Sequence, residues 1–337
     1  MAATTSTIGT GKTYSTIAAW EDAQDANPDN QDTGYCEAEA LAAVAFAGGT
    51  YTATNYPHLT AKLGAEHDGR AHERSGAGNA RIEVAAATSP VSIDDEYVRV
   101  SWMEVKGPGD NRYNIGVSCT ASYPILVHHC IVHNNNATGL FSSASGITEN
   151  TAGGSYIYRN ICYGYKSYGI ITYGANAIAA LLCNTVYCNG YSGDAGIRDI
   201  AAVGSITNNA CFANTKDFYN TNGVMDYNAS SDTTADDEGA NSIANLTTAN
   251  QFVAPTTTWA ETDLLHKLGA GIIGEGVDLS GDVATYPEIN VSIRNGATRA
   301  TIGAGVAWDI GADQYVAAAP AGVPMPILLS SRRRWSN

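Results

Sequence analysis

A repeated strand motif is the feature of this sequence that most restricts its fold. In four segments a polar or small residue precedes an alternating pair that ends in an aromatic residue or His, and Asn or Gly follows. The segments are Cys130–Asn134, Asn160–Tyr163, Asn184–Asn189 and Asn209–Asn214. The equivalent positions Val105, Val132, Cys162, Val186 and Cys211 follow one another at similar intervals. A recurrence every about 24 to 30 residues indicates a repeat architecture.

A second series runs out of phase with the first. It consists of Ile115–Val117, Gly139–Leu140, Gly169–Ile171 and Gly196–Ile197. Leu140, Ile170 and Ile197 follow one another at the same irregular interval as the first series. Two strand families with a common period predict one structural coil per period.

The repeat is too short for a strand, helix and strand unit, which needs about 30 residues or more. The intervals show alternation and Gly or Asn turns without helical periodicity. We therefore predict an all-β right-handed parallel β-helix, a solenoid whose like residues stack from coil to coil. Val132, Cys162, Val186 and Cys211 would lie inside, and Asn160, Asn184 and Asn209 would form a ladder of hydrogen-bonded amides. The alternative is chance recurrence of such motifs in an Asn-rich chain.

The two ends of the chain differ from the repeat, as the ends of a solenoid must. Tyr14–Ala23 predicts a short capping helix, with Ser15 as its cap and Ile17, Trp20 and Ala23 on one face. We expect an N-terminal cap and first coils over 1–90, regular coils over 91–225, and C-terminal coils with an irregular closing region over 226–315. A Pro- and Ala-rich linker and a basic tail follow over 316–337.

Composition and charge exclude several classes of function. Eighteen basic against 33 acidic residues give a net charge of −15, which disfavours binding to nucleic acid and to anionic membranes. We expect no membrane span and no signal peptide, because no long apolar run and no basic leader are encoded. Seven cysteines without paired spacing disfavour a zinc site or a disulfide framework. We predict no cofactor and no metal.

These segments resemble right-handed parallel β-helix repeat proteins of bacteria and tailed bacteriophages. Asn184–Tyr187 is similar to their recurrent Asn-Thr-hydrophobic strand. Asp263–Leu264, Gly274–Asp278 and Asp309–Tyr315 are similar to the closing end of many such chains. The resemblance covers about residues 90 to 315 and implies the fold. Because this fold carries lyases, hydrolases, adhesins and phage spikes alike, it implies little about function.

Few motifs point to catalysis. Gly9–Thr13 lacks the first glycine of a phosphate loop, since Ser6 stands at that position. A polysaccharide lyase or hydrolase needs carboxylates that converge from neighbouring coils. The candidates are Asp94, Asp95, Glu96, Asp194, Asp199 with Arg198, Asp236, Asp237 and Glu238. They do not share a ladder position in consecutive coils, so we interpret them as solvated loop charges and predict no catalytic residue.

Three histidines, His128, His129 and His133, form the densest imidazole group. His128 and His129 should point to opposite faces of a strand, whereas His129 and His133 share a face. A metal site would need a third ligand from an adjacent coil, for which Glu149 is the candidate. The alternative, which we prefer, is ordinary strand histidines.

Tyrosines and the C-terminal tail are the candidate contact sites. The tyrosines are Tyr163, Tyr165, Tyr168, Tyr173, Tyr187 and Tyr191. Some of them should form an exposed strip that stacks on sugars or packs on another subunit, unless all are stacked within the ladder. The predicted anchoring tail contains Ile327, Leu328, Leu329, Arg332, Arg333, Arg334 and Trp335.

The sequence favours a non-enzymatic structural protein of a bacteriophage virion, either a capsid decoration or a component of a fibre or spike. Its expected partners are other virion proteins of the capsid or tail, further copies of this chain, with a trimer as one arrangement, and a surface polysaccharide. The alternative function is a polysaccharide-degrading lyase or hydrolase on the same fold. A secreted adhesin is disfavoured by the missing export signal.

Overall fold

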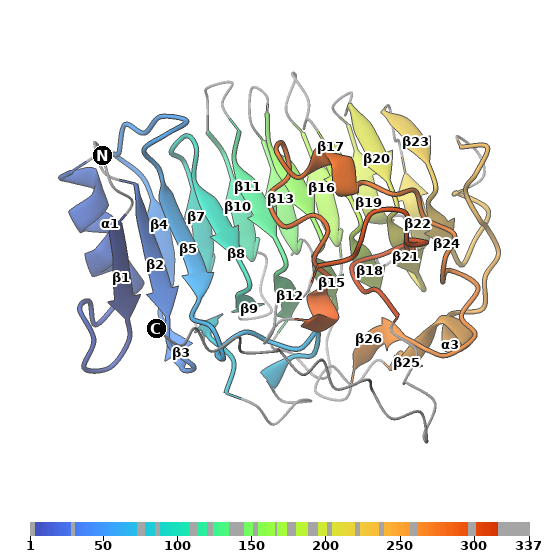
Figure 1. Ribbon diagram of the computed structural model, residues 1–337, viewed down its shortest axis with the longest axis horizontal. Helices are drawn as coiled ribbons and strands as arrows, with labels where there is room; N and C mark the ends of the chain where they lie inside the picture. The colour runs from blue at the N-terminus through green and yellow to red at the C-terminus, as the bar shows by residue number, and fades with distance from the viewer. Residues whose placement is uncertain are drawn as a thin grey trace, which may run out of the picture.

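The computed structural model shows an all-β chain built around three long parallel sheets, with few helices (Figure 1). It describes residues 4–27, 31–72, 78–84, 88–107, 113–119, 124–134, 145–150, 154–165, 167–173, 180–187, 195–200, 204–219, 223–235, 239–256, 262–295 and 301–315.

The three sheets are named A, B and C. Sheet A contains β1 (Thr4–Ile8), β2 (Asp32–Cys36), β5 (Pro57–Ala61), β8 (Arg99–Ser101), β11 (Leu126–His128), β14 (Tyr156–Tyr158), β17 (Ala180–Leu182), β20 (Ser205–Thr207) and β23 (Val224–Asp226). Sheet B contains β3 (Ala40–Leu41), β6 (Arg81–Glu83), β9 (Glu104–Gly107), β12 (Ile131–Asn134), β15 (Ile161–Tyr163), β18 (Thr185–Tyr187), β21 (Ala210–Phe212) and β24 (Ala229–Ser230). Sheet C contains β4 (Val44–Phe46), β7 (Val91–Ile93), β10 (Ile115–Val117), β13 (Ile147–Glu149), β16 (Ile170–Thr172), β19 (Ala195–Asp199) and β22 (Lys216–Tyr219).

From β2 to β24 the chain passes through sheets A, B and C in that order again and again. We call one such passage a circuit. Each strand pairs in parallel with the strands of the circuits before and after it, as β12 does with β9 and β15. This parallel stacking is consistent with a solenoid.

The first predicted ladder is confirmed. Val105 pairs with Val132, Val132 with Cys162, Cys162 with Val186, and Val186 with Cys211. All five side chains are fully buried in the core between the sheets. The ladder also continues beyond the predicted limits, to Ile82 before Val105 and to Ser230 after Cys211.

The second predicted series is correct only in part. Ile170 pairs with Ile197 as expected, but the residue between Ile115 and Ile170 in register is Ile147. Leu140, which the sequence placed there, lies outside the described residues. The sequence revealed only two strand families, because the strands of sheet A carry no recurrent motif. The structure has three strands in each circuit.

The corner between sheets A and B is a two-residue turn that recurs in successive circuits. Its first residue takes a left-handed backbone conformation although it is not glycine. These residues, with their φ angles, are Trp102 (58°), His129 (53°), Arg159 (57°), Cys183 (53°), Asn208 (58°) and Tyr227 (54°). A left-handed non-glycine residue costs about 1–2 kcal/mol. Because this costly left-handed conformation recurs from corner to corner, we infer that the second corner residue stabilises the turn.

In the last four of these corners the second residue is Asn and forms the predicted Asn ladder, which Asn228 extends by one further circuit. The backbone N–H groups of Asn160, Asn184 and Asn209 each donate to the side-chain Oδ1 of the next ladder residue, at 3.0, 3.0 and 2.9 Å. The side-chain amide of Asn184 donates in turn to the backbone oxygen of Ile157, at 2.9 Å. Each amide therefore satisfies buried backbone groups of the preceding circuit, which would otherwise be costly.

A helix covers the N-terminal end of the stack, as predicted (Figure 1). This helix, α1 (Ile17–Asp25), buries Ile17 and Trp20, and the Trp20 indole donates to Asp32 at 2.7 Å. Its cap is Thr16 and not Ser15, because the Thr16 hydroxyl accepts the N–H of Ala19 at 3.1 Å.

The closing region runs back along the outside of the sheets as a long irregular segment, drawn in orange and red (Figure 1). We call residues 262–295 and 301–315 the strap. It is preceded by α3 (Thr248–Gln251) and β25 (Phe252–Ala254), and it contains β26 (Asp263–His266), which pairs antiparallel with β25, and the turns η2 (Ser280–Asp282) and η3 (Ile293–Asn295).

The strap packs on the outer faces of sheets A and B. Leu126 and Leu182 of sheet A contact Ile289 and Trp308 in one apolar cluster. Residues of sheet B join Phe252, Leu264 and Ile310 in a second cluster. This second layer explains why outward strand residues such as Leu126, Leu182, Ile131 and Ile161 are apolar.

The left-handed corner residues anchor the strap, because their side chains point outward from the stack. Arg159 is fully buried and donates to the backbone oxygens of Ile289, Gly311 and Ala312 at 2.9, 3.3 and 3.2 Å. Its guanidinium also lies over the ring of Trp308, 4.8 Å from the centroid. Asn208 exchanges two hydrogen bonds with the backbone of Val277, at 2.8 and 2.9 Å.

We expect Asn184→Ala to reduce the free energy of unfolding by about 3 kcal/mol, because it leaves the Asn160 N–H and the Ile157 carbonyl buried without their partner. Chemical denaturation measures the loss. Asn27→Ala is the control, since the Asn27 amide makes an exposed bond to the Ala23 carbonyl. Equal denaturation midpoints for the two variants would contradict the stabilising role of the Asn ladder.

We expect Arg159→Met to detach the strap, because three strap carbonyls lose a charged donor while most of the side-chain volume is kept. Limited proteolysis with mass spectrometry should show faster cleavage within residues 262–315. Arg198→Met, on sheet C, is the control. Unchanged cleavage of the strap in Arg159→Met would contradict its anchoring role.

Candidate functional site

A groove on the outer face of sheet C is the candidate site. It encloses about 230 Å³ and crosses β7, β10 and β13 near their carboxyl ends. Its floor is a column of small residues, Ser92, Gly116 and Thr148, which are adjacent in register. Ser92 and Gly116 lie between buried apolar neighbours, and Thr148 lies between the buried residues Ile147 and Glu149, so the three face outward.

Gly116 makes the groove deep at its centre. A Cβ atom at this position would lie 3.6 Å from the Tyr113 ring, which is an ordinary contact distance. The absence of a side chain therefore leaves space in the groove, and no backbone strain is involved. The Thr148 hydroxyl lies at the floor, buried, and makes no hydrogen bond within the described part of the chain. The floor thus offers polar groups in a hollow.

Two tyrosines flank this floor. Tyr113 is 41% exposed and Tyr173 is 43% exposed, which makes them rare exposed aromatic side chains among the described residues. Ser118 and Asn150 add further polar groups to the lining. Aromatic faces beside hydroxyl and amide groups suit a ligand with both apolar and polar faces, such as a sugar ring.

Of the six predicted contact tyrosines, Tyr173 alone is exposed among the described ones. Tyr163 and Tyr187 lie under the strap on sheet B, and Tyr165 lies in the core between the sheets. Tyr168 is buried and accepts a hydrogen bond from Arg198. These four tyrosines are buried and form no exposed strip, so Tyr173 is the candidate that remains among the described ones. Tyr191 and the predicted tail residues lie outside the described residues.

The predicted carboxylates that lie in the described ranges do not converge in one cluster. The Asp94 carboxylate accepts hydrogen bonds from Ser118 and from Ser92, which both line the groove, so this side chain lies at the groove's edge. Asp95 is buried instead and accepts the N–H groups of Gly48 and Gly49. Burial raises the pKa of Asp95. Asp194, Asp236, Asp237 and Glu238 lie outside the described residues.

Asp199 lies in the same ladder of sheet C as Glu149, two circuits away from it. Glu149 pairs with Thr172, and Thr172 pairs with Asp199, so the three side chains stack in successive circuits of sheet C. All three are buried, and the Thr172 hydroxyl donates to Asp199 at 2.5 Å. Arg198, beside it, faces outward and lies over the rings of Tyr168 and Tyr219.

The histidines are not arranged as the strand pattern predicted. His133 pairs with Glu104 of the preceding circuit at 2.9 Å. Burial alone would raise the pKa of Glu104, but the hydrogen bonds from His133, Asn79 and the His72 N–H outweigh it and lower that pKa to about 2.

His128 and His129 meet each other, because the strand ends at His128 and the left-handed conformation of His129 turns its side chain to the same side. Their Nδ1 atoms are 2.9 Å apart. Glu149, the predicted third ligand, lies on sheet C, and the carboxylate next to this pair is Glu288 of the strap.

The sequence analysis missed the floor of the groove and Glu288. A signal for the floor exists, since Val91–Ile93, Ile115–Val117 and Ile147–Glu149 each place a small residue between two strand positions. Glu288 has no comparable signal, because it stands in the irregular strap far from its partners in the sequence.

No protein-family model matches this chain, and searches of curated proteins and of solved structures give no match. Within the described ranges, none of the helices has the length and apolar character needed to cross a membrane.

Proposed function

We propose that this chain is a right-handed parallel β-helix that serves as a non-enzymatic structural protein of a bacteriophage virion and binds a surface glycan in the groove of sheet C. The observation that carries the glycan proposal is the groove itself, with two exposed tyrosines beside a floor of small polar residues. The virion setting, as capsid decoration or as part of a fibre or spike, rests on the sequence resemblance.

The stacked sheets suit such a role. Successive strands of sheet C are hydrogen-bonded in a fixed register, so the floor and the two tyrosines are held on a rigid frame. A rigid site loses little conformational entropy on binding, which favours recognition of flexible sugar chains. Assembly with other virion proteins and with further copies of this chain, for which a trimer is one arrangement, belongs to the same proposal.

We expect the double substitution Tyr113→Ala and Tyr173→Ala to weaken glycan binding about tenfold or more, because two ring contacts are lost. Gly116→Val should also weaken it by filling the groove. A glycan array that includes bacterial capsule and O-antigen polysaccharides supplies the ligand, and titration calorimetry supplies the affinities.

Tyr35→Ala is the matched control, since Tyr35 is a partly exposed tyrosine on sheet A. Equal affinities for the native protein and the double variant would overturn the groove assignment. The virion setting has a separate test, which is mass spectrometry of purified particles with copy number. Particles without this chain would overturn it.

A polysaccharide-degrading lyase or hydrolase is the alternative, favoured by one specific observation. Asp94 lies at the edge of the groove, because its carboxylate accepts hydrogen bonds from Ser118 and Ser92 of the lining. A carboxylate beside a bound sugar is a group that glycoside hydrolysis uses.

If the alternative holds, the native protein releases reducing ends or unsaturated uronates from a polysaccharide that it binds, and Asp94→Asn abolishes the release while binding persists. Binding without any release of such products would reject the alternative and leave the non-enzymatic proposal standing.

A further inference from the structure

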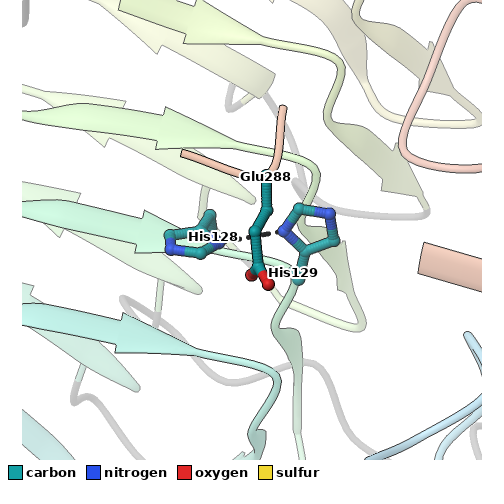
Figure 2. Close-up of side chains that lie close together, drawn as sticks. All are labelled: His128, His129 and Glu288. Atoms are coloured by element: carbon teal, nitrogen blue, oxygen red, sulfur yellow. Dashed lines mark hydrogen bonds between the residues drawn. The ribbon is translucent and has the colours of Figure 1, made fainter. Parts of the chain in front are cut away.

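The geometry points to a divalent transition-metal site, of the zinc type, formed by His128, His129 and Glu288, which fastens the strap to the stacked sheets (Figure 2). This inference departs from the expectation that the chain holds no metal. It stands independently of the proposed glycan binding.

The three side chains offer a suitable ligand set. One nitrogen from each imidazole and one carboxylate oxygen all lie within 4.8 Å of one another. Figure 2 shows the two rings and the carboxylate gathered around one point between the sheet and the strap. Two imidazoles and a carboxylate are a known donor set for zinc, with the fourth position left to water.

The ring of His129 is fixed in the form that binds a metal through Nδ1. Its Nε2 lies 2.7 Å from the Val291 carbonyl oxygen, which can only accept, so the Nε2 nitrogen carries the proton. The lone pair of Nδ1 then points toward His128. A backbone carbonyl that accepts the outer N–H of a ligating histidine is a common supporting contact in metal sites.

The separation of the two Nδ1 atoms fits an ion between them. They are 2.9 Å apart, whereas two nitrogens on one tetrahedral zinc ion are about 3.3 Å apart. An opening of a few tenths of an ångström therefore converts this contact into a pair of ligands. The competing arrangement is a hydrogen bond in which His128 Nδ1–H donates to His129 Nδ1.

Aromatic rings and an indole hold all three groups in place. The Trp102 ring stacks on His129 with 4.3 Å between centroids, and the Tyr158 ring stacks on His128 with 4.7 Å. The Trp102 indole N–H donates to Glu288 Oε2 at 2.8 Å and so orients the carboxylate. His128 and His129 are 2% and 0% exposed. The ligands are thus preorganised in a site that is screened from solvent.

The site joins two parts of the chain that are distant in sequence. His128 and His129 belong to the corner after β11, whereas Glu288 and Val291 belong to the strap. Glu288 also has a left-handed φ of 59°, a conformation that needs external support in a non-glycine residue. A metal that binds only the docked strap stabilises it by mass action.

The test uses the full chain, freed of metal by a chelator and titrated with Co²⁺ and then with Zn²⁺. We expect one equivalent of Co²⁺ to produce visible ligand-field bands of a nitrogen and oxygen site without a thiolate charge-transfer band, and Zn²⁺ to displace it. Zn²⁺ should also raise the melting temperature and slow proteolytic cleavage within the strap.

Glu288→Gln keeps an oxygen for the Trp102 N–H but removes the charged ligand, and it should weaken Co²⁺ binding more than about tenfold. His128→Gln should abolish the bands. His133→Gln is the matched control, because His133 is an imidazole of sheet B that pairs with Glu104 and stacks on Tyr163, away from the proposed ion. Circular dichroism confirms that each variant is folded.

Two results would overturn the site. One is a native protein that binds less than one equivalent of Co²⁺ or Zn²⁺, which would leave the hydrogen bond between the two rings as the explanation. The other is a folded Glu288→Gln variant with unchanged affinity and spectrum. Neither result bears on the glycan groove, which lies on sheet C.

Discussion

The two-residue corner between sheets A and B is the constraint on which the rest of the structure depends. A turn this short requires a left-handed residue, and six non-glycine residues from Trp102 to Tyr227 adopt that conformation. The Asn ladder offsets the cost of this conformation, since each amide satisfies buried backbone groups of the neighbouring circuit. From Asn160 to Asn228 this corner bonds each circuit to the next in a constant register.

The same corner also anchors the strap that covers the stacked sheets. Its left-handed residues point outward and present Arg159, His129 and Asn208 as anchors for the strap. The strap packs on sheets A and B, and the groove lies on sheet C. The strap and the proposed metal site are therefore arranged by one repeated feature of the backbone.

Much of the interior could be predicted from the sequence, since stacking places like residues in register. Val132 and Asn184 were recognised because their equivalents recur at each circuit. The exterior could not be predicted in the same way. Tyr163 was a candidate for an exposed contact strip, but the strap, which is distant from it in sequence, covers it. The prediction that His128 and His129 point to opposite faces of a strand was wrong. A strand pattern cannot reveal a left-handed residue at the end of the strand.

Amide hydrogen exchange across the native chain tests the central claim most directly. If one corner holds both the circuits and the strap, the amides of Asn160, Asn184 and Asn209 and those of strap residues 289–293 should be among the slowest to exchange, and Asn184→Ala should accelerate both groups together. A strap that exchanges as fast as exposed loops, or that is unaffected by this substitution while the ladder opens, would contradict the account.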